Sequence, residues 1–189
     1  MSYVMSANMF VTTALSIANN LKTLYVLGGY GHPLTLENKE LLITQWNDGD
    51  AYNKEHANEI RQATEDTFAF DCICLIKAIM WGFNANLSHP RGGAFIDEAK
   101  IPDKNANDMW NTYCVNHSND FTSILPGEML WLNNHAGIYI GNGFAIEATA
   151  AFTRNVAITN VQNIPSQAKG FQRMWVGHAQ LPCIDYTGS

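Results

Sequence analysis

The chain contains the stretch Asp71-Cys72-Ile73-Cys74-Leu75-Ile76-Lys77-Ala78-Ile79-Met80-Trp81, an apolar run that begins at an aspartate. Its length and composition are typical of a buried helix, and aspartate is one of the residues preferred at the N-cap position. The pattern therefore predicts a helix with Cys72 in its first turn. Unpaired backbone amides at a helix start favour a thiolate, so Cys72 is a candidate nucleophile.

Downstream of this helix the hydrophobic pattern changes to the short alternating runs of strands. The tripeptide Gly141-Asn142-Gly143 is the strongest hairpin signal in the chain. Strands are expected at 129–132, 135–140, 144–149, 156–161 and 171–178. Helices are expected upstream at 7–22 and 35–46 and between the two halves at 106–114. Helices followed by an antiparallel sheet predict an α+β domain in which the Cys72 helix packs on the sheet.

Length and composition predict one globular domain over residues 1–189, with 47% hydrophobic and 15% charged residues. Residues 1–23 are interpreted as an N-terminal helical segment, and the polar residues within 31–66 as an insertion. The net charge of −6 comes without a basic cluster, which argues against nucleic-acid binding. No apolar run approaches the roughly 18 residues that span a bilayer, so no membrane segment or signal peptide is predicted.

The four cysteines follow neither a disulfide framework nor a zinc-site spacing, and reduced thiols are expected. Cys74 is expected in the core, and Cys114 and Cys183 have no supporting motif. The histidines other than His135 form no metal-binding spacing. No metal and no organic cofactor is therefore predicted.

His135 is the candidate general base for Cys72, because a strand that starts there and packs on the Cys72 helix would aim the imidazole at the helix end. Glu147 lies twelve positions later, across the predicted hairpin, and an even separation is compatible with one face of the sheet. A carboxylate there would orient the imidazole and stabilise the imidazolium of a Cys–His ion pair. Glu147 as an ordinary exposed strand carboxylate is the competing interpretation.

Three blocks follow one another along the chain: Asp71-Cys72-Ile73-Cys74-Leu75, then Pro126-Gly127-Glu128-Met129, then His135-Ala136-Gly137-Ile138-Tyr139-Ile140-Gly141. In this order they resemble the NlpC-type cell-wall cysteine peptidases, which have a papain-like fold. Tyr25-Val26-Leu27-Gly28-Gly29 is similar to the Y-x-x-G-G segment of that family, and the resemblance covers roughly residues 24–159.

The resemblance implies that Cys72 is the nucleophile, His135 the base and Glu147 the orienting group. It also implies that Tyr25 and Asp71 line the substrate site, that Tyr25 donates a hydrogen bond near the nucleophile, and that backbone amides at the helix start form the oxyanion hole. Two departures stand out. Ile73-Cys74 replaces the Ser-Gly of the family, and Glu147 replaces its usual third histidine, although Glu147-Ala148-Thr149 is similar to an E-x-T sequence of phage-encoded relatives.

The function implied is hydrolysis of an amide bond in the stem peptide of bacterial peptidoglycan, either intact or as soluble muropeptides. A D-glutamyl to diamino-acid endopeptidase is favoured, and a muramoyl-L-alanine amidase is the other possibility within the family. Such a protein would act outside the cell or after release. Two alternatives of other classes stay open: a papain-fold acyltransferase or deamidase, and a catalytically silent binding module.

Overall fold

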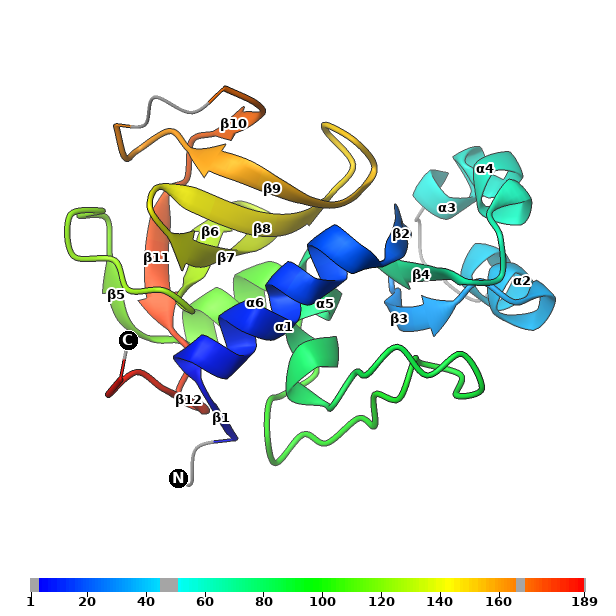
Figure 1. Cartoon of the computed structure of the whole chain (residues 1–189), viewed down its shortest axis with the longest axis horizontal. Helices are drawn as coiled ribbons and strands as arrows, with labels where there is room; N and C mark the ends of the chain where they lie inside the picture. The colour runs from blue at the N-terminus through cyan, green and yellow to red at the C-terminus, as the bar shows by residue number, and fades with distance from the viewer. Residues whose placement is uncertain (1–3, 45–50, 166–168, 189) are drawn as a thin grey trace.

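The computed structural model describes residues 4–44, 51–165 and 169–188, and within these ranges helices and strands are mixed (Figure 1). The helices are α1 (Ala7–Asn20), α2 (Leu36–Thr44), α3 (Ala51–Glu55), α4 (Ala57–Gln62), α5 (Cys72–Met80) and α6 (Ala106–Thr112). The strands are β1 (Met5–Ser6), β2 (Lys22–Tyr25), β3 (Tyr30–Pro33), β4 (Thr67–Phe70), β5 (Val115–Ser118), β6 (Met129–Leu132), β7 (His135–Gly141), β8 (Phe144–Thr149), β9 (Asn155–Val161), β10 (Gln172–Arg173), β11 (Gly177–Gln180) and β12 (Ile184–Asp185). The predicted α+β class is confirmed.

The main sheet has the strand order β10-β9-β8-β7-β6-β11-β5 and is antiparallel except for the β10–β9 pair. The hairpin predicted at Gly141-Asn142-Gly143 joins β7 to β8, and all three residues have positive φ. Asparagine and glycine adopt that conformation at low cost, which explains why the turn falls there. A register shift between Tyr139 and Gly141 adds a bulge just before the turn.

One face of the main sheet is covered by α5 and α1, which lie side by side across it (Figure 1). Every residue of α5 is buried, so this helix is apolar all round except for Lys77. Phe10 and Ala14 of α1 pack in the same cluster as Ile76 of α5 and Ile138 of β7. The central helix is thus fixed between the sheet and a second helix, and its N-terminal end has a defined place at the edge of the core.

The expected helix over 7–22 ends at Asn20, because the chain turns extended and enters β2 at Lys22. Ser6 caps it by accepting a hydrogen bond from the Met9 amide. The expected helix over 106–114 ends at Thr112. No helix in the described ranges is both long enough and apolar enough to cross a bilayer.

Residues interpreted as an insertion form a second, smaller lobe with its own core. β3 and the helices α2, α3 and α4 lie there, and Leu34, Leu42 and Ile60 pack together. The lobe is joined to α5 through a three-stranded sheet of order β2-β4-β3. Its central strand β4 is the last of the three along the chain and leads directly into that helix. Part of the expected 35–46 helix and of the insertion expected within 31–66 lies outside the described residues, because residues 45–50 are not among them.

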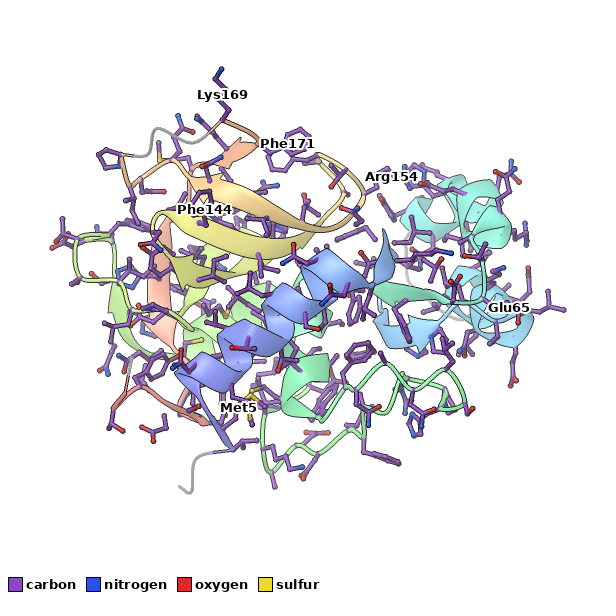
Figure 2. All side chains as sticks on the ribbon, viewed as in Figure 1. Met5, Glu65, Phe144, Arg154, Lys169 and Phe171 are labelled. Atoms are coloured by element: carbon purple, nitrogen blue, oxygen red, sulfur yellow. The ribbon has the colours of Figure 1, made fainter. Side chains whose placement is uncertain are left out.

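Arg154, in the loop after β8, connects the two lobes (Figure 2). Its Nη2 atom lies 2.6 Å from Glu59 Oε2 of α4, and its Nη1 atom lies 2.8 Å from the His56 ring. The backbone carbonyl of Arg154 also accepts a hydrogen bond from the amide of Tyr25. The smaller lobe is therefore tied to the sheet next to the Tyr25 segment.

The strand expected over 171–178 is wrong, because the chain forms two short strands on different parts of the sheet. β10 lies at one edge beside β9, whereas β11 pairs with β6 and β5 near the other edge. Between them both backbone groups of Trp175 are hydrogen-bonded to the side chain of Asn163, at 2.8 and 3.0 Å, and are lost to the sheet. The Trp175 indole lies over Gly137, where any Cβ atom would come within 2.7 Å of the ring.

Candidate active site

Cys72 is the first residue of α5, as the sequence predicted, and Asp71 is the N-cap. The Oδ1 atom of Asp71 accepts a hydrogen bond from the Cys74 amide at 2.7 Å. This bond satisfies one of the amides that a helix start leaves unpaired. The aspartate before the apolar run therefore fixes where the helix begins and places the thiol there.

Asp71 also fixes the segment that contains Tyr25. Its Oδ2 atom accepts a hydrogen bond from the Gly28 amide at 2.8 Å, and its own amide donates to the carbonyl of Gly29 at 3.2 Å. Gly28 has a φ of 75°, and a Cβ on Gly29 would lie 2.7 Å from the Ala69 backbone. The paired glycines are thus required by a turn and by a close approach to β4.

The Cys72 side chain is buried, with the residue only 6% exposed. Its Sγ atom lies 4.0 Å from the carbonyl oxygen of Asn134, the residue before His135. Burial raises the pKa of the Cys72 thiol to about 12, and the negative charge of Asp71 acts in the same direction. Backbone hydrogen bonds at Ala136, Ile73 and Cys72 itself oppose this shift without cancelling it. Cys72 is therefore a neutral thiol at pH 7, in contrast to the thiolate expected from the helix start alone.

His135 and Glu147 are brought together as the hairpin predicted. The His135 Nε2 atom lies 2.6 Å from Glu147 Oε2, and the imidazole stacks on Trp175 with ring centroids 5.5 Å apart. The bond to Glu147 occupies Nε2. In the part of the chain that the structure describes, Nδ1 of His135 has no hydrogen-bond partner, so it is the nitrogen available to a reacting group.

Glu147 is completely buried on β8, which rules out the interpretation as an exposed strand carboxylate. Its Oε1 atom accepts a hydrogen bond from the Thr159 hydroxyl at 2.7 Å, and Arg173 Nε lies 2.7 Å from Oε2. Burial alone would raise the pKa of Glu147, but the bonds and charges of His135 and Arg173 outweigh burial and hold the pKa below its usual value. The carboxylate is therefore ionised at pH 7.

The thiol and the imidazole approach the start of β7 from different sides. Cys72, the first residue of α5, packs in the core with Ala136 of that strand. His135 stacks on Trp175, which lies on the other face of the sheet. Among the described residues no hydrogen bond joins Cys72 to His135. The expectation that the ring is aimed at the helix end is therefore not met. His135 is the first residue of β7 and directly follows Asn134, whose carbonyl the thiol contacts.

A cleft of about 540 Å³ opens beside Cys72. Tyr25 and Asp71 line it, as does Asn134 from the turn before β7. Burial raises the pKa of the Tyr25 hydroxyl above its usual range, so this group is a neutral hydrogen-bond donor. Within the described residues no hydrogen bond joins that hydroxyl to Cys72.

One wall of the cleft contains a lysine whose positive charge is paired with an aspartate. Lys77 of α5, which also lines the cleft, donates to Asp103 Oδ1 at 2.6 Å and to the carbonyl of Lys104 at 3.1 Å. Its ammonium also lies 3.4 Å from the Tyr30 hydroxyl. With the ammonium so paired, Lys77 and Asp103 together add little net charge to the cleft, and Tyr30 adds aromatic surface.

Arg173, Thr159 and Trp175 are three residues of this site that the sequence analysis did not identify. All three surround the His135–Glu147 pair, and they come from β9, β10 and the crossing segment between β10 and β11. The expected continuous strand over 171–178 concealed Arg173 and Trp175, since it predicted no crossing of the sheet face, whereas Thr159 lies in a strand that the sequence predicted. The available signal in the sequence was Arg173-Met174-Trp175, in which an arginine and a tryptophan are separated by one residue.

Comparison with known proteins adds no family to this description: no protein-family model matches the chain, and no curated protein is similar enough in sequence to count as a match. In the described ranges no group of three or more histidine, cysteine, aspartate or glutamate side chains is placed to hold a metal ion.

Proposed function

We propose that this protein is a cysteine hydrolase with a papain-like fold of the NlpC type, which cleaves an amide bond in the stem peptide of bacterial peptidoglycan. The observation that carries the proposal is the Nε2–Glu147 bond of His135, which leaves Nδ1 without a partner on the residue that follows Asn134, whose carbonyl the Cys72 thiol contacts. Amide hydrolysis by a cysteine needs a nucleophilic thiol, a histidine that transfers protons and a group that orients this histidine. Cys72 at a helix start, His135 at a strand start and the buried Glu147 are the candidates for these roles.

In the proposed first step the Cys72 sulfur attacks the amide carbonyl carbon while Nδ1 of His135 accepts the thiol proton. The carbonyl oxygen gains negative charge in the tetrahedral intermediate, and the backbone amides at the start of α5 stabilise it. His135 then returns the proton to the leaving amine, and a thioester on Cys72 remains. Glu147 stabilises the imidazolium while it exists.

In the second step His135 accepts a proton from water, and the resulting hydroxide attacks the thioester carbonyl. The carbon–sulfur bond breaks, the sulfur regains a proton from His135, and a carboxylic acid leaves, which loses its proton to solvent at neutral pH. Because the Cys72 thiol is neutral and has a raised pKa, the proton transfer to His135 accompanies attack. No hydrogen bond joins the thiol and the ring among the described residues, so the proposed step requires the two groups to approach each other when substrate is bound.

The cleft beside Cys72 supports a peptide substrate. Its volume is within the range of small-molecule sites, and the aromatic rings of Tyr25 and Tyr30 with Asn134 offer surface and hydrogen bonds to a short peptide. The D-glutamyl to diamino-acid bond is the favoured target and the muramoyl to L-alanine bond the second. Both targets place the protein at the bacterial cell wall, outside the cell or after release.

The experiment is to incubate purified peptidoglycan, and separately its soluble muropeptides, with wild type, Cys72→Ala and Cys74→Ala, and to identify products by mass spectrometry. We expect wild type and Cys74→Ala to cut one bond that Cys72→Ala leaves intact. Cys74 is the matched control because it is a second buried thiol two residues away on the same helix. The fragment masses identify the bond.

One observation favours the alternative of a catalytically silent binding module, namely the buried Cys72 thiol that makes no bond to His135. Such a protein would bind muropeptides without cleaving them. Isothermal titration of wild type with muropeptides, followed by product analysis of the same sample, separates the two: binding with no product after prolonged incubation supports the silent module. A thioester on Cys72 that passes to an added amine, with no hydrolysis, would instead indicate the acyltransferase alternative.

A further inference from the structure

The Arg173 guanidinium and the His135 imidazole both contact the same oxygen of the buried Glu147 carboxylate. His135 Nε2 lies 2.6 Å and Arg173 Nε 2.7 Å from Oε2 of Glu147. The other oxygen, Oε1, accepts the Thr159 hydroxyl at 2.7 Å. The negative charge of Glu147 is therefore compensated by a permanent cation, whether or not the imidazole carries a proton.

Arg173 is held in place by several contacts. Its side chain is only 16% exposed, and Nη2 donates to the Thr149 hydroxyl at 3.0 Å. The guanidinium lies 4.7 Å from the centroid of the Phe152 ring and 5.8 Å from that of Trp175, the ring on which His135 stacks. A planar, always charged group fixed in this way is a stable component of the site.

Electrostatics gives this arrangement a consequence for His135. A buried carboxylate beside a histidine favours the protonated ring, and a protonated ring cannot accept a proton from a thiol. Arg173 cancels much of that attraction. The ionisable groups at the start of α5 lie on the other face of the sheet, where the Cys72 thiol is neutral and Asp71 is held as the helix cap. β9 presents only the uncharged hydroxyl of Thr159.

We propose that Arg173 is a positioning residue: its fixed guanidinium compensates the charge of Glu147 and so weakens the preference of that carboxylate for a protonated His135 ring. Its catalytic consequence rests on the proposed function. The electrostatic relation between Arg173, Glu147 and His135 can be measured without any substrate.

The test is a pH titration of the His135 ring, followed by NMR in protein labelled at histidine and assigned by the signal that disappears in His135→Gln. In Arg173→Gln we expect the midpoint of the titration to rise by about one pH unit or more, because a cation is lost beside the pair. Arg173→Lys, which keeps the charge, should stay closer to wild type. The matched control is Arg61→Gln, which removes an exposed arginine paired with Glu40 on the smaller lobe and should leave the midpoint unchanged.

A double variant keeps the test decisive if Arg173→Gln does not fold because Glu147 loses its ion-pair partner. In Glu147→Gln the carboxylate is absent and Arg173 repels the imidazolium, so the midpoint should fall below wild type. Glu147→Gln with Arg173→Gln should bring it back up. Equal midpoints with and without Arg173, in either background, would overturn the proposal.

Activity assays then separate this proposal from the proposed function. If wild type cleaves peptidoglycan, the acidic limb of its kcat/KM profile should move to higher pH in Arg173→Gln by the shift that NMR measures. If wild type cleaves nothing while the NMR midpoints shift as expected, the proposed function is wrong and the role of Arg173 stands. If wild type cleaves peptidoglycan and the NMR midpoints do not shift, the proposed function stands and the role of Arg173 is wrong.

Discussion

The helix side and the sheet side of the candidate site hold their reactive groups by different means. On the helix side Cys72 is positioned by backbone and by the Asp71 cap, and its thiol is neutral. On the sheet side His135 is positioned by an ionised carboxylate that Arg173 and Thr159 hold in turn. The charged groups next to the imidazole, Glu147 and Arg173, therefore belong to the sheet side of the site.

This difference indicates how the site would work. A preformed thiolate–imidazolium pair needs both charges in place before substrate arrives. Here desolvation disfavours the thiolate, and on the sheet side Glu147 is ionised and bonded to His135. In the proposed mechanism the nucleophile is therefore prepared by its position, and the base by its bond to an ionised carboxylate.

The largest expected effect comes from removing the carboxylate on the sheet side. Glu147→Gln should lower kcat by about 10³- to 10⁴-fold, because the imidazole loses the group that orients it and stabilises its proton. The matched control is Glu128→Gln, which changes another buried glutamate that is paired with a buried histidine, His178. Equal losses in the two variants, per folded molecule, would mean that Glu147 has only a structural role.

On the helix side the pH dependence of alkylation tests the neutral thiol. With a pKa of about 12 for Cys72, the thiolate fraction rises about tenfold for each pH unit below that value. Alkylation by iodoacetamide, located on the Cys72 peptide by mass spectrometry, should therefore increase about 100-fold from pH 7 to pH 9 without levelling off. A plateau that begins near neutral pH would show a thiolate–imidazolium pair instead.

A smaller effect is expected from the hydroxyl that supports the carboxylate. Thr159→Val removes the donor to a buried, ionised Glu147 and should lower the free energy of unfolding by about 1.5–3 kcal/mol. Thr112→Val, at an exposed helix position where the hydroxyl bonds the carbonyl of Asp108, should cost within about 0.5 kcal/mol. Urea unfolding measures both, and comparable losses would show that the Glu147 oxygen needs no such donor.

The helix cap is expected to have the smallest effect of the four. Asp71→Ala should lower the free energy of unfolding by about 1–2 kcal/mol, the typical loss for an N-cap. Its hydrogen bond to the Gly28 amide is lost as well, so hydrogen exchange at Gly28 should become faster. Asn105→Ala, at the exposed cap of α6, is the reference: a cost as large as that of Asp71→Ala would argue against a special role for the buried cap.

The sequence predicted well the features that depend on local patterns. Asp71 followed by an apolar run gave the start of α5, and Gly141-Asn142-Gly143 gave the β7–β8 turn. From that turn the meeting of His135 and Glu147 followed, because residues of equal parity share a face of a strand pair. Each of these inferences uses contacts between residues close in sequence or joined by a short turn.

Features set by distant contacts were missed. β2 pairs in parallel with β4, more than forty residues away, and no local pattern announces that pairing. Arg173 reaches Glu147 from β10, which pairs in parallel with β9. Trp175 reaches His135 because the chain crosses the sheet face after β10, where Asn163 bonds the backbone groups of Trp175. The neutral state of the thiol was missed too, since the helix start favours the anion while burial, a property of the whole core, opposes it more strongly.

The most direct test of the central claim is to trap the intermediate on Cys72. Wild-type protein mixed with soluble muropeptides and quenched in acid within the first turnovers should show, by intact-mass and peptide analysis, an acyl group on the peptide that contains Cys72. Cys74→Ala should show the same adduct, and Cys72→Ala should show none and release no product. Cleavage that persists in Cys72→Ala, or that proceeds in wild type while no acyl group ever forms on Cys72, would contradict the account.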